Sequence, residues 1–157
     1  MAKKATPMDA QLILHLYELR REETLRKARD WYFREFNPES LADFQAAMFS
    51  AQSGYLRMVL TYWDMAAALV NDGAIDLKMF TDCNGEHIGV FCKIEPLLAD
   101  IRATYNPAFA AQLEKLIDSM PNGRERVAKS KEQMKGIRAR MAQMQTAATA
   151  APAKAAS

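Results

Sequence analysis

The sequence has few of the residues that break helices or cross-link loops. Its 157 residues include 6 glycines, 6 prolines and 2 cysteines. Two cysteines cannot build the disulfide framework of a small secreted domain. No apolar run is long enough to cross a bilayer, and the first residues do not lead into the apolar segment of a signal peptide. We therefore expect a cytoplasmic protein without a transmembrane segment.

Enzyme motifs are also missing from the sequence. There is no glycine-rich phosphate loop and no Glu-x-x-His element of a di-iron bundle. Cys83, His87 and Cys92 are spaced C-x3-H-x4-C, whereas structural zinc usually takes four ligands that include closely spaced pairs. We interpret them as buried thiols and a surface histidine, with hydrolysis or ligand binding at these three residues as the alternative. We expect no catalytic residue, no metal and no cofactor, and a protein that is not an enzyme.

The residues that are abundant are those of a helical domain. Half of the chain is hydrophobic, which is enough for the core of one domain. Ala, Leu, Met, Glu, Lys, Arg and Gln dominate, and these residues lose little side-chain entropy in a helix. The sequence predicts a single all-α domain, a bundle of about five helices with one long central helix and a basic amphipathic C-terminal helix.

Caps and prolines predict where these helices begin and end. The first helix is predicted at residues 7–36, from a Thr6 cap to Asn37-Pro38. Apolar residues at three–four spacing predict the central helix at residues 38–72, and two helices that meet at Gly54 are the alternative. Further helices are predicted after Asp76, at residues 86–105 with a kink or restart at Pro96, and from Asn106-Pro107 onward.

Four segments follow from these boundaries. Residues 1–7 are predicted to be a flexible N-terminus and residues 8–121 a helical bundle domain. Residues 122–146 are predicted to be the basic amphipathic helix. The Ala-rich residues 147–157 offer nothing large to bury, so we expect a disordered tail there.

Charge is distributed unevenly between the bundle and the C-terminal segment. Residues 1–123 carry 13 basic and 17 acidic side chains, and the chain from Arg124 onward carries eight basic and two acidic ones. Lys131, Lys135 and Arg138 follow one edge of the predicted C-terminal helix, with Glu125 and Glu132 on the opposite side. A basic amphipathic helix can bind phosphates, an acidic protein groove or an anionic membrane surface.

An apolar seam runs along the same C-terminal helix. Its residues recur in alternating steps of three and four, as in about three heptads of a coiled coil. The seam consists of Val127, Ser130, Met134, Ile137, Met141 and Met144. Such a short coiled coil is weak without a partner. We therefore predict a non-enzymatic interaction module that self-associates or binds a protein partner through Val127, Met134, Ile137, Met141 and Met144.

Nucleic-acid binding is the alternative function for this helix. Its cations are close enough to contact several phosphates of one backbone, and no base-reading motif is present, so such binding would be non-specific. The predicted phosphate contacts are Lys129, Lys131, Lys135, Arg138 and Arg140.

A motif in the middle of the chain adds a family resemblance. Residues 69–73, LVNDG, are followed by Ile75 and Asp76, and several later positions fit the same pattern: Lys93, Pro96, Arg102, Asn106, Pro107, Glu114 and Leu116. Over residues 55–117 the chain resembles a bacterial family of small helical proteins known only as a domain of unknown function. Members of that family often carry an N-terminal membrane helix, which this sequence does not show. The resemblance implies a helical fold and no known activity.

Overall fold

The computed structural model describes residues 4–150, and residues 1–3 and 151–157 lie outside the described part. The described residues form α-helices and one short 3₁₀ helix, with no strand among them, so the predicted all-α class is confirmed. In chain order the helices are α1 (Pro7–Arg20), α2 (Glu23–Arg34), α3 (Leu41–Met48), α4 (Ser53–Asn71), α5 (Leu77–Cys83), α6 (Glu86–Ile94), the 3₁₀ helix η1 (Glu95–Leu97), α7 (Leu98–Thr104), α8 (Ala111–Ser119) and α9 (Gly123–Ala150).

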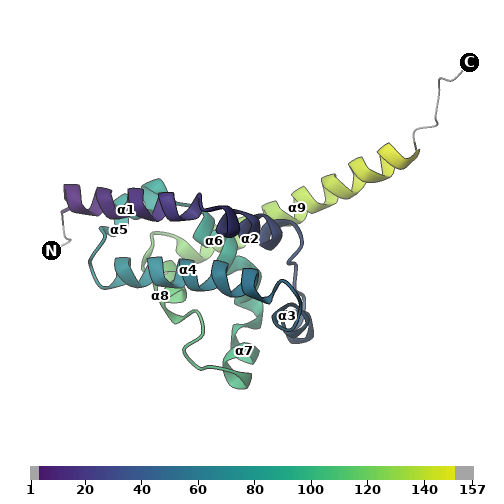
Figure 1. The fold of residues 1–157 in the computed structure, drawn as a ribbon, viewed down its shortest axis with the longest axis horizontal. Coiled ribbons are helices and arrows are strands. Elements are labelled where there is room, and N and C mark those ends of the chain that lie inside the picture. The colour runs from purple at the N-terminus through teal and green to yellow at the C-terminus, as the bar shows by residue number, and fades with distance from the viewer. Residues whose placement is uncertain (1–3, 151–157) are drawn as a thin grey trace, which may run out of the picture.

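Helices α1 to α8 form the body of the molecule, and α4 lies at its centre. Helix α4 packs against α2 and against α8, while α1 lies beside α5 and α6 packs against α9 (Figure 1). Its apolar residues face in several directions, and Leu56, Trp63 and Ala66 are almost completely buried. A helix that buries most of its circumference stabilises the body through burial of apolar surface.

The two longest predicted helices in the body are each divided in the structure. The first is divided into α1 and α2 because the carboxylate of Glu22 accepts from the backbone N–H groups of Thr24 and Leu25 and starts a new helix. The predicted central helix at residues 38–72 is divided into α3 and α4. Ser50 Oγ donates to the carbonyl of Ala47 at 2.8 Å and accepts from the N–H of Gln52 at 3.1 Å, which competes with the helical pattern.

Other predicted boundaries are close to the observed ones. Thr6 caps α1, Asp76 caps α5, and Pro96 interrupts the helix between α6 and α7. Helix α8 begins at Ala111, later than predicted, after turns at residues 106–110 that end with Ala110 at φ 51°. The body therefore contains more and shorter helices than the predicted bundle of about five. Helix α9 includes residues 147–150, and residues 151–157 of the predicted tail lie outside the described part.

A half-buried carboxylate connects four of the helices. Glu86 at the start of α6 accepts from Arg29 of α2 at 2.7 Å and from the indole N–H of Trp63 of α4 at 3.3 Å. Arg20 of α1 lies 3.9 Å from the same carboxylate. This ion-pair network fixes α6 relative to the body, and α6 is the helix on which α9 packs.

Candidate functional site

The C-terminal helix leaves α8 through a turn that tolerates few side chains. Asn122 adopts a left-handed conformation with φ 55°, which Asn accepts more readily than most residues. A Cβ atom on Gly123 would lie 1.8 Å from the carbonyl oxygen of Ile117, so only glycine fits there without a backbone shift. The turn therefore sets the direction in which α9 leaves α8.

Arg124 in the first turn of α9 attaches the helix to the body. Its guanidinium donates to Asp118 at 2.6 Å, to Glu95 at 2.9 Å and to Glu114 at 3.0 Å. These carboxylates raise the pKa of Arg124, with Asp118 contributing most. The predicted excess of basic charge in the C-terminal segment is thus partly neutralised at its first arginine.

The first half of α9 belongs to the core of the molecule. Val127 is only 1% exposed, and Ser130 and Met134 are half-buried. Helix α6 approaches closely at Gly89, where a Cβ atom would lie 3.1 Å from the ring of Phe33 and 3.5 Å from Met134. Val127 was predicted to bind a partner, but it is buried by the chain's own body and is not available for that.

The second half of α9 projects away from the body (Figure 1). Ile137 is 56% exposed, Met141 45% and Met144 72%, although they continue the same seam. Where α9 leaves the body it forms one wall of a groove of about 340 Å³ with the end of α2. The groove is lined by Phe33, Arg34, Asn37, Met134, Ile137, Arg138 and Met141.

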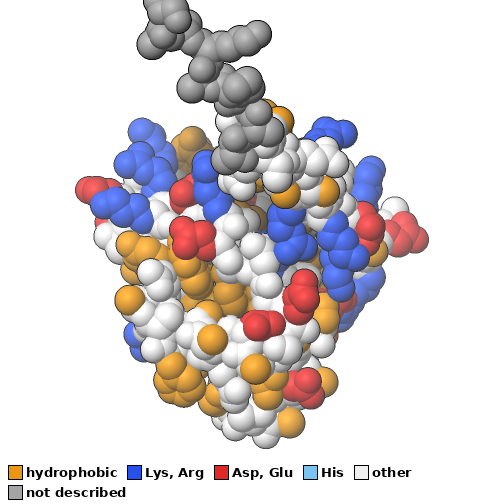
Figure 2. Space-filling view, turned by 90° about the vertical axis from the view of Figure 1, so that its right-hand side faces the viewer, with side chains coloured by type: hydrophobic (Ala, Val, Ile, Leu, Met, Phe, Trp, Pro, Cys, Tyr) orange, Lys and Arg blue, Asp and Glu red, His pale blue; other side chains and the backbone are white. Residues whose placement is uncertain are grey.

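The predicted phosphate contacts lie on two edges of α9 rather than on one face. Lys131, Lys135 and Arg138 line a pocket between α9, α6 and the segment after α2. Lys129 lines a separate hollow beside Gly85, and Arg140 is exposed farther along the helix. Lys and Arg side chains gather around α9 in Figure 2, which looks at the face from which this helix projects.

Lys93 lies at the floor of the pocket and was not predicted as a site residue. Its ammonium donates to the carbonyls of Tyr32 and Phe36, both at 2.7 Å, and lies 3.1 Å from the carbonyl of Phe33 and from Asn37 Oδ1. Burial, and secondarily Arg138, lower the pKa of Lys93 to about 8. The signal in the sequence was a single lysine inside the otherwise apolar run of residues 88–94.

The structure does not bring Cys83, His87 and Cys92 together as a metal site. Cys83 is exposed, so its predicted burial is wrong, whereas Cys92 is buried as predicted and its thiol donates to the carbonyl of Gly89. His87 is fully buried between Trp63 and Phe80, so the predicted surface histidine is wrong. Burial lowers the pKa of His87 to about 4. No group of three metal-ligating side chains occurs among the described residues.

Comparisons with known proteins address the body rather than the site. The family described as Domain of unknown function (DUF4760) matches residues 5–120, which end just before α9 begins. No curated protein and no solved structure gave a match. In the described part of the chain, no helix combines the length and the apolar character needed to cross a membrane. Because the match covers most of its length, the chain belongs to the family Domain of unknown function (DUF4760).

Proposed function

We propose that this protein is a non-enzymatic interaction module that binds an acidic amphipathic helix of another protein through the second half of α9. One observation carries the proposal. The apolar seam that packs on the body at Val127 and Met134 continues at the same spacing through Ile137, Met141 and Met144, where it is exposed. A contiguous exposed apolar stripe on a helix is typical of a docking surface.

The groove at the base of this stripe is lined by apolar side chains from two helices. Phe33 from α2 and Met134, Ile137 and Met141 from α9 line its two sides. An amphipathic helix can place apolar side chains at i, i+3, i+4 and i+7 along such a groove. The methionines suit this role because the flexible thioether side chain adapts to different partners.

Charge around the stripe favours an acidic partner over a second copy of this chain. Residues 133–148 contain Lys135, Arg138 and Arg140 and no Asp or Glu. A second copy would bring a second set of these cations to the interface, where like charges repel. An acidic helix would instead pair with them along both edges of the stripe. Three exposed seam residues are also few for a stable homotypic coiled coil.

The test uses a fluorescent synthetic peptide with Leu at i, i+3, i+4 and i+7 and Glu on its remaining faces. Fluorescence anisotropy should give a dissociation constant of about 1–100 μM, and the Lys-for-Glu version of the peptide should not bind. The double variant Ile137→Ser, Met141→Ser should weaken binding by at least about tenfold. Phe49→Ser is the matched control, because Phe49 is 79% exposed on the body and is not part of the groove.

Two results would contradict the proposal. Equal affinity of the parent and the double variant would mean that the stripe is not the docking surface. A dimer in sedimentation equilibrium that the double variant abolishes would mean that a second copy occupies the stripe.

Non-specific nucleic-acid binding is a second candidate, favoured by one specific observation. Among the described residues, Lys129, Lys131, Arg138 and Arg140 form no ion pair, and Lys135 pairs only with Glu132. Four or five phosphate contacts predict a slope of roughly −3 to −5 when log affinity is plotted against log salt. Binding of an RNA or DNA oligonucleotide without such a slope would contradict this candidate. Binding that survives replacement of Lys129, Arg138 and Arg140 by Gln would also contradict it.

A further inference from the structure

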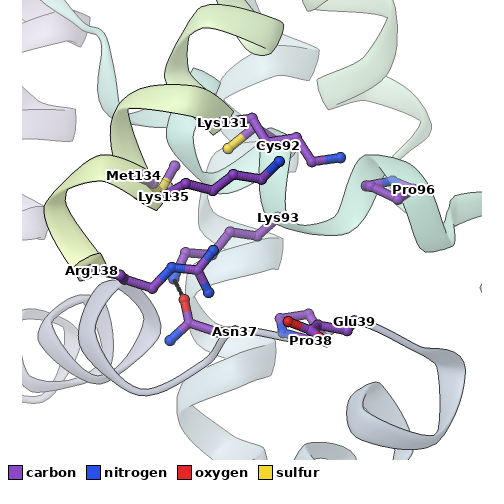
Figure 3. Close-up of a pocket in the computed structure, with 10 residues that line it drawn as sticks. All are labelled: Asn37, Pro38, Glu39, Cys92, Lys93, Pro96, Lys131, Met134, Lys135 and Arg138. Carbon is purple, nitrogen blue, oxygen red and sulfur yellow. Dashed lines mark hydrogen bonds between the residues drawn. The ribbon is translucent and has the colours of Figure 1, made fainter. Parts of the chain in front are cut away.

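A recessed pocket beside the groove carries the strongest evidence for a second ligand. It has a volume of about 220 Å³ and lies between α9, the end of α6 and the segment that follows α2. Figure 3 shows Lys135 and Arg138 extending from α9 toward Lys93, with Pro38 and Glu39 on the opposite wall. The remaining walls are formed by Asn37, Cys92, Pro96, Lys131 and Met134.

Of the four cations that line this pocket, Lys135 alone has a carboxylate partner among the described residues, Glu132 at 3.1 Å. In the body, Arg29 and Arg102 each have a carboxylate partner within 4 Å. The side chains of Lys131 and Arg138 have neither an ion pair nor a hydrogen bond to any other residue that the structure describes. Cations that converge on a hollow without a partner attract an anion.

Lys93 adds charge to this pocket without offering a free donor. An ammonium group has three N–H bonds, and Lys93 is surrounded by three carbonyl oxygens and the amide oxygen of Asn37. Its hydrogens are therefore already used, and it acts on a ligand through its charge alone. The direct donors for an anion are Arg138, Lys135 and Lys131.

We propose that this pocket binds a small phosphate monoester, which goes beyond the partner-binding function. The guanidinium fork of Arg138 matches phosphate oxygens, and a dianion suits a pocket in which four cations face the single carboxylate of Glu39. The volume equals that of roughly seven water molecules, which accommodates a phosphate group and a few more atoms. Met134, Pro38 and Pro96 supply apolar surface for those atoms.

The probes for this site are phenyl phosphate, inorganic phosphate and benzoate, titrated into the full-length protein by calorimetry and by two-dimensional NMR. Phenyl phosphate should bind with a dissociation constant of about 0.1–1 mM and several-fold more tightly than the other two. Inorganic phosphate lacks the apolar ring of phenyl phosphate, and benzoate lacks its second negative charge. Equal affinity for all three probes would overturn the proposal.

Substitutions of cations and of the carboxylate in the pocket should change the affinity for phenyl phosphate in opposite directions. Arg138→Gln should weaken phenyl phosphate binding by at least about tenfold, and Lys131→Gln and Lys135→Gln by about threefold or more each. Glu39→Gln should tighten binding by about two- to fivefold, because it removes the opposing carboxylate. The exposed positions of Lys135, Arg138 and Glu39 make these changes compatible with folding.

Lys129→Gln is the matched control, because it removes the same charge from the other edge of α9. It should change the affinity by less than about twofold. A loss equal to that of Lys131→Gln would mean that the anion responds to the general charge of α9 and not to the pocket. The double variant Ile137→Ser, Met141→Ser should leave phenyl phosphate binding unchanged, so this proposal and the partner-binding function can fail separately.

Discussion

The two halves of α9 have the same sequence pattern and opposite surroundings. In residues 123–134, Arg124 is held by three carboxylates and Val127 is buried in the core. In residues 135–148, the seam residues Ile137, Met141 and Met144 are exposed. An apolar seam in the sequence therefore predicts that a helix makes a contact, but the packing of the other helices determines which seam residues are already buried.

Substitutions in the two halves of α9 should differ most in their effect on the free energy of unfolding. Val127→Asp places a carboxylate in the core, so the free energy of unfolding should fall by at least about 3 kcal/mol. Ile137→Asp changes the same seam on the projecting half and should alter stability by less than about 0.5 kcal/mol. Urea unfolding followed by circular dichroism measures both. Similar losses in the two variants would show that the second half also packs on the body.

Acid should weaken the body beneath the first half of α9. The pKa of His87 is lowered from 6.5 to about 4, first by burial and then by Arg126 of α9, so the folded state favours the neutral ring. Above pH 6.5 the ring of His87 is neutral in both the folded and the unfolded state, so its burial carries no charge penalty. As the pH falls from 6.5 to 4 the unfolded state takes up the proton first, and about 3 kcal/mol of stability should be lost.

The variant His87→Leu isolates this contribution from that of the carboxylates. Urea unfolding at pH 7, 5.5 and 4.5 should show a smaller dependence of stability on pH than in the parent protein. Residues 135–148 contain no His, Asp or Glu, so the projecting half has no group that titrates in this range. An unchanged pH dependence in the variant would contradict the role given to His87.

A smaller effect is expected at the start of α9. Arg124→Met leaves Asp118, Glu95 and Glu114 without their shared cation and should lower the free energy of unfolding by about 1 kcal/mol, since the network is partly exposed. Arg140→Met removes an unpaired arginine from the projecting half and should have almost no effect. Thermal unfolding of both variants in parallel tests this difference, and equal shifts would contradict it.

Much of the fold could be predicted from local sequence signals. The Thr6 and Asp76 caps and the interruption at Pro96 were predicted because each signal acts over a few residues. The divisions at Glu22 and Ser50 were not predicted, because the apolar spacing continues through them. Each division results from side-chain hydrogen bonds to the backbone by residues that also occur inside helices. Three–four spacing predicts a helical face but not whether neighbouring stretches remain one helix.

The candidate site was predicted only in part, for a similar reason. The spacing of the seam identified Met134, Ile137, Met141 and Met144, but it could not show that Val127 is buried by the body. The pocket combines α9 with Lys93, Asn37 and Glu39, which are brought together only by the tertiary packing. In the sequence, the lysine inside an apolar helix was the one local signal of this pocket. The burial of His87 likewise depends on Trp63 and Phe80 from other helices.

Hydrogen–deuterium exchange along α9, with and without the acidic peptide, tests the proposed docking surface most directly. In the free protein, amides of residues 127–134 should be strongly protected and those of residues 138–148 should exchange much faster, because only the first half packs on the body. Adding the peptide should protect residues 137–144 and leave α1 unchanged. Strong protection of residues 138–148 in the free protein, or no change on adding the peptide, would contradict a free docking surface on the second half of α9.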